Sequence, residues 1–109
     1  MSNSFALMET NKETFAEIIN GNKPVLVDFF ATWCGPCKTQ VPILKEVSSE
    51  LGESARILKI DVEQNQQLSA EYNIRSIPTL VLFKNGQEKW RTSGLQMKDA
   101  LVKLLKSYS

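Results

Sequence analysis

The sequence contains two cysteines, Cys34 and Cys37, within the stretch ATWCGPCK that runs from residue 31 to residue 38. Two thiols at this spacing can exchange with disulfides, contribute half of a metal site, or lie unreactive in a core. A structural zinc site needs four ligands, usually in two separated pairs, and the chain has no histidine. The sequence therefore argues against a zinc site within one chain and leaves a site shared between two chains open.

The position of Cys34 favours redox chemistry over inert packing. Cys34 follows a segment that predicts a buried strand and precedes one with helical spacing. Unpaired N–H groups and the positive end of the helix dipole stabilise an anion there, so the thiol pKa in such motifs falls from about 8.5 to about 3.5–7.5. We predict that Cys34 attacks a partner's disulfide, and that Cys37, one turn further, resolves the mixed disulfide. Gly35 leaves room for a partner's backbone, and Pro36 stiffens the turn.

Asp28 interrupts the otherwise apolar segment from Pro24 to Ala31. Burying an acid is costly unless it has a partner, so the alternative is an edge position that reaches water. Lys59 lies in the next apolar segment, and its alternation could place it on the same side as Asp28. Burial raises an Asp pKa by up to about 3–5 units and a nearby cation lowers it by about 1–3, so we predict a net rise. Asp28 would then accept the Cys37 proton, through a water molecule, near neutral pH.

Strand and helix patterns alternate along the chain and would position these residues. The first half predicts a strand at Phe5–Met8 and a helix carrying Phe15, Ile18 and Ile19, with a candidate capping box at Thr10–Glu13. Residues 24–31 predict a buried strand, and Val41, Leu44, Val47, Ser48 and Leu51 form the apolar side of a helix. The second half predicts a strand at 55–62, a short helix capped by Asn65, a hairpin with an Asn85-Gly86 turn, and a final helix from Met97 to Leu105. This order predicts the α/β class, with helices on both faces of a mixed sheet.

Composition limits the remaining possibilities. With 109 residues, 42% of them hydrophobic, the chain predicts one domain spanning 1–109. The net charge is +1 and the basic residues are dispersed, which argues against nucleic acid as a partner. No segment approaches the roughly 20 apolar residues that span a membrane, and the start lacks a signal-peptide pattern, so we expect a cytoplasmic protein with reduced thiols.

Several motifs together resemble the thioredoxin family. They are the active-site stretch Trp33–Lys38, Asp28 six residues before Cys34, the triplet Ile77-Pro78-Thr79, and further matches at Pro42, Lys59, Phe83–Gly86 and Gly94. The resemblance covers nearly the whole chain. It implies the thioredoxin fold, a three-layer α/β/α arrangement with about five strands and about four helices, and the activity of a general protein-disulfide reductase without a bound cofactor. It also implies oxidised proteins as substrates and an NADPH-dependent flavoprotein, thioredoxin reductase, as electron donor; nothing in the sequence requires more than a monomer.

The resemblance also places a substrate groove. It implies a cis peptide at Ile77-Pro78, with Pro78 beside the cysteines and the Ile77 backbone pairing with an extended substrate segment. The remainder of this shallow apolar groove would comprise Trp33, Gly35, Pro36, Gly94 and Leu95. From the local sequence alone, Pro78 is equally compatible with a proline that begins a strand.

Two residues near the active-site motifs depart from the family pattern, and one functional alternative stays open. Phe30 stands where many members have a tryptophan, and Ser76 replaces a common glycine before Ile77; we expect effects on packing under the site and on partner choice. The alternative function is a binding module, in which the same groove holds a partner as a regulatory or assembly subunit without turnover.

Overall fold

A five-stranded mixed sheet forms the middle layer of the computed structural model, which describes residues 5–7 and 14–109. Its strands are β1 (Phe5–Leu7), β2 (Val25–Phe30), β3 (Arg56–Asp61), β4 (Thr79–Lys84) and β5 (Gln87–Ser93). The spatial order is β1-β3-β2-β4-β5. β3 pairs in parallel with both β1 and β2, whereas β4 pairs antiparallel with β2 and β5. The predicted α/β class and mixed sheet are therefore confirmed.

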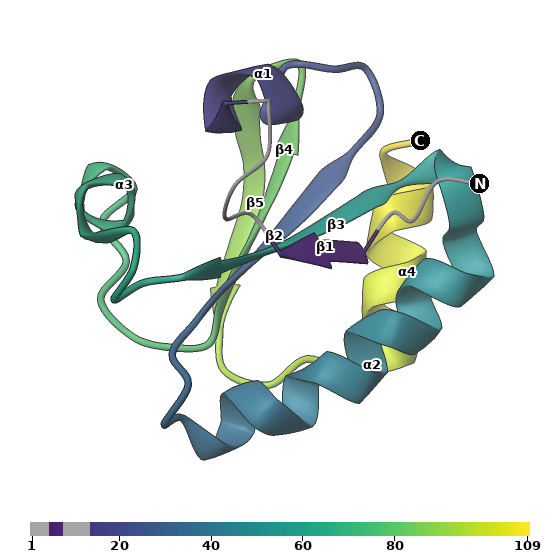
Figure 1. Ribbon diagram of the computed structural model, residues 1–109. Coiled ribbons are helices and arrows are strands. Elements are labelled where there is room, and N and C mark those ends of the chain that lie inside the picture. Colours follow the sequence, from purple (N-terminus) through teal and green to yellow (C-terminus); the bar gives the residue numbers. More distant parts are fainter. Residues whose placement is uncertain (1–4, 8–13) are drawn as a thin grey trace.

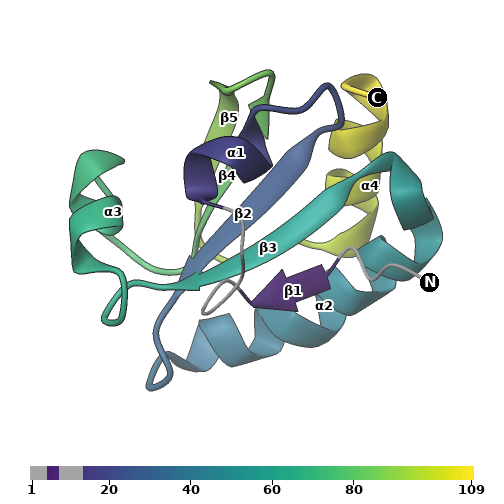
Figure 2. The same ribbon diagram turned by 45° about the horizontal axis from the view of Figure 1, so that its top comes forward.

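Helices cover both faces of this sheet, as predicted. They are α1 (Phe15–Ile19), α2 (Gly35–Leu51), α3 (Gln66–Glu71) and α4 (Lys98–Ser107), with a single 3₁₀ turn at Gly52–Ser54 after α2. Figures 1 and 2 show α2 and α4 on one side of the sheet and α1 and α3 on the other. Within the described residues, every helix is too short or too polar to span a bilayer.

The central strand β2 separates two apolar cores. Val27 and Phe29 pack on the face covered by α1, with Phe15, whereas Leu26 packs with Leu44 and Leu101 on the α2 and α4 face. All six residues of β2 are buried, which explains its nearly continuous apolar sequence. Because successive side chains of a strand point to opposite faces, the side chains of residues 26, 28 and 30 lie on the α2 side.

The predicted hairpin turn is confirmed, and a helix-capping box is present at another position. Asn85 and Gly86 both have positive φ, 54° and 79°, and form the predicted hairpin turn between β4 and β5. The capping box predicted at Thr10–Glu13 lies outside the described residues. The structure has a capping box at the start of α1, where the Thr14 N–H donates to Glu17 Oε1 at 2.9 Å and the Glu17 N–H donates to Thr14 Oγ1 at 3.2 Å.

The predicted side-chain cap at Asn65 is wrong. Asn65 does occupy the N-cap position of α3, but its amide makes no capping hydrogen bond to the helix. Instead its Nδ2 donates to the Asp61 carbonyl at 3.0 Å, while Asp61 Oδ1 accepts the Glu63 N–H at 2.8 Å. The Asn65 side chain is thus a donor to the turn between β3 and α3, and it does not serve as an acceptor for the first turn of the helix.

Candidate active site

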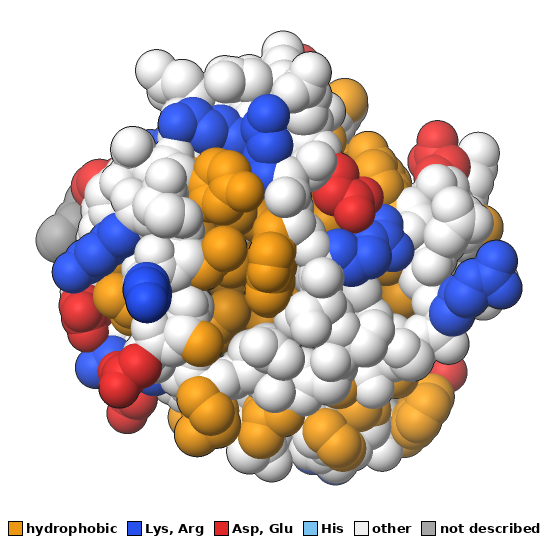
Figure 3. Space-filling view, turned by 180° about the vertical axis from the view of Figure 1, so that it is seen from behind, with side chains coloured by type: hydrophobic (Ala, Val, Ile, Leu, Met, Phe, Trp, Pro, Cys, Tyr) orange, Lys and Arg blue, Asp and Glu red, His pale blue; other side chains and the backbone are white. Residues whose placement is uncertain are grey.

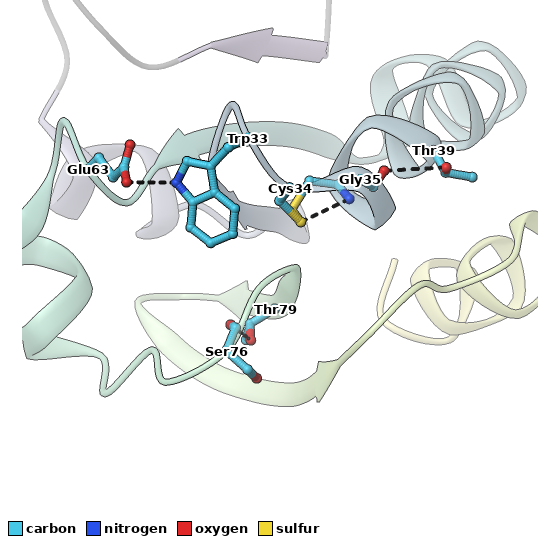
Figure 4. Close-up of a disulfide and its surroundings, with 8 residues drawn as sticks. Trp33, Cys34, Gly35, Thr39, Glu63, Ser76 and Thr79 are labelled. Carbon is cyan, nitrogen blue, oxygen red and sulfur yellow. Dashed lines mark hydrogen bonds between the residues drawn. A yellow bond between two sulfur atoms is a disulfide. The ribbon is translucent and has the colours of Figure 1, made fainter.

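Cys34 and Cys37 are joined in a disulfide, with their Cα atoms 5.2 Å apart. Cys34 is the N-cap residue of α2, and its Sγ accepts a hydrogen bond from the Cys37 N–H at 3.2 Å (Figure 4). The predicted position of Cys34 at the mouth of a helix is thus confirmed. Cys34 is 5% exposed and Cys37 2% exposed, so both residues are buried in the oxidised form.

The end of β2 brings the disulfide against the sheet. Phe30 and Ala31 pack directly with the two cysteines, and Ile77 packs against that cluster. The Cys34 N–H donates to the Ala31 carbonyl at 3.2 Å, which closes a tight turn between β2 and α2. Local sequence therefore fixes the path from strand to helix, while Ile77 arrives from about 40 residues further along the chain.

The loop before β4 faces the disulfide. The Ile77-Pro78 peptide is cis, as the family resemblance implied, and Pro78 is buried just before β4 begins at Thr79. The Gly94 N–H donates to the Pro78 carbonyl at 2.8 Å, which joins this loop to the end of β5. Figure 4 shows Ser76 of this loop and Thr79, the first residue of β4, across from Cys34 and Gly35.

Three hydroxyl groups connect the same loop to β5. Ser76 Oγ donates to Ser93 Oγ at 3.1 Å, and Thr79 Oγ1 donates to the Ser76 carbonyl at 2.6 Å. The Ser93 and Thr79 hydroxyls are 3.2 Å apart. Ser76, noted above as a departure from the family pattern, thus makes a specific contact with β5.

The predicted groove residues reach the surface around the disulfide. Trp33 is 66% exposed and Leu95 39% exposed, Gly35 and Pro36 are exposed, and Gly94 is partly exposed. Trp33 Nε1 donates to Glu63 Oε2 at 2.7 Å, which orients the indole ring (Figure 4). A pocket of about 200 Å³ lies between these elements, lined by Trp33, Val62, Ile74, Arg75, Ser76 and Ile77. The structure therefore brings Trp33 and Ile77, distant in sequence, to one hollow.

Asp28 is fully buried in the middle of the sheet. It is 0% exposed and stands opposite Lys59 on β3 and Leu80 on β4. The alternative of an edge position is wrong, because β2 is the central strand. Neither carboxylate oxygen has a hydrogen-bond partner among the described residues. Burial raises the pKa of Asp28 to about 7, against the opposing charge of Lys59, so the predicted net rise is confirmed.

Lys59 stands opposite Asp28 and contacts the ring of Phe30, which packs with the two cysteines. Its Nζ lies 4.0 Å from the centroid of the Phe30 ring, a cation–π contact. Burial lowers the pKa of Lys59; the charge of Asp28 acts in the opposite direction, Lys45 lowers the pKa further and Asp61 raises it. Phe30 therefore contacts the disulfide cluster and the cation, a role that the sequence did not indicate.

Replacing Phe30 by leucine should raise the pKa of Asp28 further, because it removes the cation–π contact of Lys59, whose charge lowers that pKa. Without the ring, the ammonium group of Lys59 is held less firmly beside the carboxyl. NMR titration of Asp28 measures the shift, and Phe30→Trp should restore the wild-type value. Phe29→Leu, the same change on the opposite face of β2, is the matched control; equal shifts in Phe30→Leu and Phe29→Leu would contradict the contact's role.

Gln40 is a residue of this region that sequence reasoning missed. The predicted apolar side of α2 began at Val41, but the buried residues of the helix are Cys37, Gln40, Leu44 and Val47. Their spacing of three, four and three residues is the helical signal that could have identified position 40 as buried. Gln40 is 0% exposed and its amide bonds to the backbone of Gln96.

Charge is dispersed over the surface seen in Figure 3. On that face, Lys and Arg side chains stand in several places, separated by acidic, hydrophobic and other side chains. This arrangement differs from the continuous basic surface that follows a nucleic-acid backbone.

Comparisons with known proteins agree with this geometry. The family model described as Thioredoxin matches residues 6–107. A thioredoxin from Rickettsia prowazekii (strain Madrid E) is 48% identical over 86 residues, which are 79% of this chain and 82% of that protein. A bifunctional thioredoxin reductase/thioredoxin from Mycobacterium leprae (strain TN) is 45% identical over 94 residues, 86% of this chain and 20% of that protein.

Solved structures give the same result for the fold. A mutant thioredoxin from Halobacterium salinarum NRC-1 superposes with a TM-score of 0.86 and 37% identity, over 99% of this chain and 94% of that one. The fold implied by the motifs is therefore confirmed. A disulfide at the mouth of a helix, a facing cis-proline loop and a family match along almost the entire length lead to one conclusion: the chain belongs to the thioredoxin family of thiol–disulfide oxidoreductases.

Proposed function

We propose that Cys34 is the attacking thiol and Cys37 the resolving thiol of a general protein-disulfide reductase. In the reduced protein, the Cys34 thiolate attacks one sulfur of a substrate disulfide, forms a mixed disulfide and releases the other sulfur as a thiolate. The Cys37 thiolate then attacks Cys34 Sγ, which forms the Cys34–Cys37 disulfide and releases the reduced substrate. Two electrons pass from this protein to its substrate. The observation that carries the proposal is the disulfide itself, with Cys34 at the N-cap of α2.

Asp28 and Lys59 supply the proton chemistry in this proposal. Asp28 has a pKa of about 7, so it exchanges a proton in the range where a general base is effective. It accepts the Cys37 proton through a water molecule, which activates the resolving thiol. Lys59 stands opposite Asp28 on β3 and favours the charged form of the carboxyl, which keeps the pKa of Asp28 from rising further.

The groove binds an extended segment of the oxidised substrate in this proposal. Ile77 offers backbone hydrogen bonds beside the disulfide, Pro78 supports the cysteines, and the exposed surface of Trp33 supplies apolar contact. The other predicted contacts are Gly35, Pro36, Gly94 and Leu95.

Reduced protein is regenerated by an NADPH-dependent flavoprotein, thioredoxin reductase. Support comes from the Mycobacterium leprae relative, whose name joins a thioredoxin reductase and a thioredoxin in one protein. We further propose that residues 1–109 form one domain and that the protein acts as a monomer in the cytoplasm, where thiols are kept reduced.

An insulin-disulfide reduction assay with NADPH and a thioredoxin reductase tests the proposal, together with the reduction potential of the Cys34–Cys37 pair. Catalytic reduction and a reducing potential are expected, whereas a strongly oxidising potential would reverse the assigned direction. The double variant Cys34→Ser, Cys37→Ser addresses the binding-module alternative. Its biological activity should be lost, and retained activity would instead show that binding without turnover is the function.

A further inference from the structure

A single buried glutamine joins the helix of the disulfide to a distant surface segment. Gln40 Nε2 donates to the Gln96 carbonyl at 2.9 Å, and the Gln96 N–H donates to Gln40 Oε1 at 2.8 Å. The side-chain amide therefore satisfies both backbone groups of a residue 56 positions away. Gln40 itself is 0% exposed.

The bonded residue lies between two exposed apolar side chains. Leu95 is 39% exposed and Met97 is 61% exposed, and together with Trp33 they are the large hydrophobic side chains exposed among the described residues. The same segment begins at Gly94, whose N–H donates to the Pro78 carbonyl at 2.8 Å. Residues 94–97 are thus held at Gly94 by the loop that faces the disulfide and at Gln96 by α2.

Gln40 and the reacting residue Cys34 belong to the same helix, α2. Cys34 is the N-cap of α2, and Gln40 lies six residues further along the same helix. Because a helix is rigid over two turns, the bonds of Gln40 place residues 95–97 relative to Cys34. A leucine at position 40 would have similar volume but would leave both backbone groups of Gln96 without these partners.

We propose that Gln40 is a positioning residue for substrate recognition. Through its hydrogen bonds to Gln96, it holds Leu95 and Met97 in place as an apolar wall of the groove, and an extended segment of the oxidised substrate protein packs against this wall. This inference rests on the proposed function. It adds Met97 to the predicted groove and gives a buried polar residue of α2 a role in recognition rather than in chemistry.

Steady-state kinetics with two kinds of disulfide test the proposal. In Gln40→Leu, the KM for a protein disulfide such as insulin should rise at least about fivefold with kcat nearly unchanged, the pattern of lost uniform binding. Reduction of a small aromatic disulfide, which does not reach the wall, should proceed at the wild-type rate. The matched control is Ser69→Ala, which removes another hydrogen bond from a buried side chain to the backbone, from Ser69 Oγ on α3 to the carbonyl of its N-cap residue Asn65. This variant should reduce both substrates as the wild type does.

Epistasis separates positioning from general destabilisation. In the Leu95→Ala, Met97→Ala background, adding Gln40→Leu should raise the KM by little more, since the wall is already absent. The Gln96 amide, protected in the wild type, should exchange with solvent faster in Gln40→Leu. An unchanged KM in Gln40→Leu, or an equal increase in both backgrounds, would overturn the proposal.

A further variant covers the case in which Gln40→Leu does not fold. Leu95→Ala, Met97→Ala alters only exposed side chains and should by itself raise the KM for insulin; an unchanged KM would overturn the wall. If instead the wild-type protein reduced no disulfide at all, the proposed function would fail. The two outcomes are distinguishable because the inference concerns only variants of an active protein.

Discussion

Cys34→Ser is expected to lower the rate of protein-disulfide reduction by about 10³-fold or more, because a serine hydroxyl does not ionise near neutral pH and cannot replace the attacking thiolate. Cys37→Ser should behave differently. Its Cys34 thiol still attacks the substrate, but the mixed disulfide has no resolving partner and accumulates. Mass spectrometry should detect a covalent adduct with the substrate in Cys37→Ser and little in Cys34→Ser.

The two single variants distinguish the attacking sulfur from the resolving sulfur. The chain has two cysteines, so every adduct maps to one of them in the single variants. Cys34 lies at the N-cap of α2 with its Sγ accepting the Cys37 N–H, an environment that stabilises negative charge on that sulfur. An adduct that forms as rapidly on Cys37 in Cys34→Ser would show that the roles are reversed.

Asp28→Ala is expected to stabilise the protein at pH 8 and to remove a pH dependence of its stability. The pKa of Asp28 is about 7 in the folded state and 3.8 in the reference state. Between these values the folded protein holds a proton that the unfolded chain has released, so stability falls as pH rises through this window. From pH 5 to pH 8, the wild type should lose about 2–3 kcal/mol of unfolding free energy relative to Asp28→Ala.

Urea unfolding of the oxidised proteins at both pH values measures this difference. Asp99→Ala is the control, since Asp99 is an exposed acid in the first turn of α4. Its free energy of unfolding should follow the pH dependence of the wild type. A difference between wild type and Asp28→Ala that stays constant from pH 5 to pH 8 would contradict a raised pKa in the folded state.

The same variant should slow the resolving step. If Asp28 accepts the Cys37 proton, its loss should prolong the mixed disulfide at pH 7 by about 10²-fold, the lower range for general base catalysis. The rate at which Cys34 is alkylated should change little, because that sulfur lies at the helix mouth. Gain of stability with an unchanged lifetime of the mixed disulfide would leave Asp28 as a buried acid without a catalytic role.

Local patterns were sufficient for most of the architecture. The spacing Cys34-x-x-Cys37 at a strand-to-helix junction identified the redox pair, and Asn85-Gly86 identified the hairpin, because both depend on backbone preferences of adjacent residues. The apolar segment around Asp28 predicted a buried central strand, and the structure confirms it. The cis peptide at Ile77-Pro78 followed only from the family resemblance, since the local sequence allows either isomer.

Contacts between distant segments were beyond the reach of these patterns. The sequence by itself determined the element order, the reactive cysteines and a buried acid with Lys59 as a candidate neighbour. The tertiary structure decided that Lys59 lies against the Phe30 ring and that Gln40 bonds to the backbone of Gln96. Periodicity reports which face of an element is buried, whereas the partner of a buried polar or charged group is set by how separate elements pack, and here that packing assigns Gln40 to a segment 56 residues away.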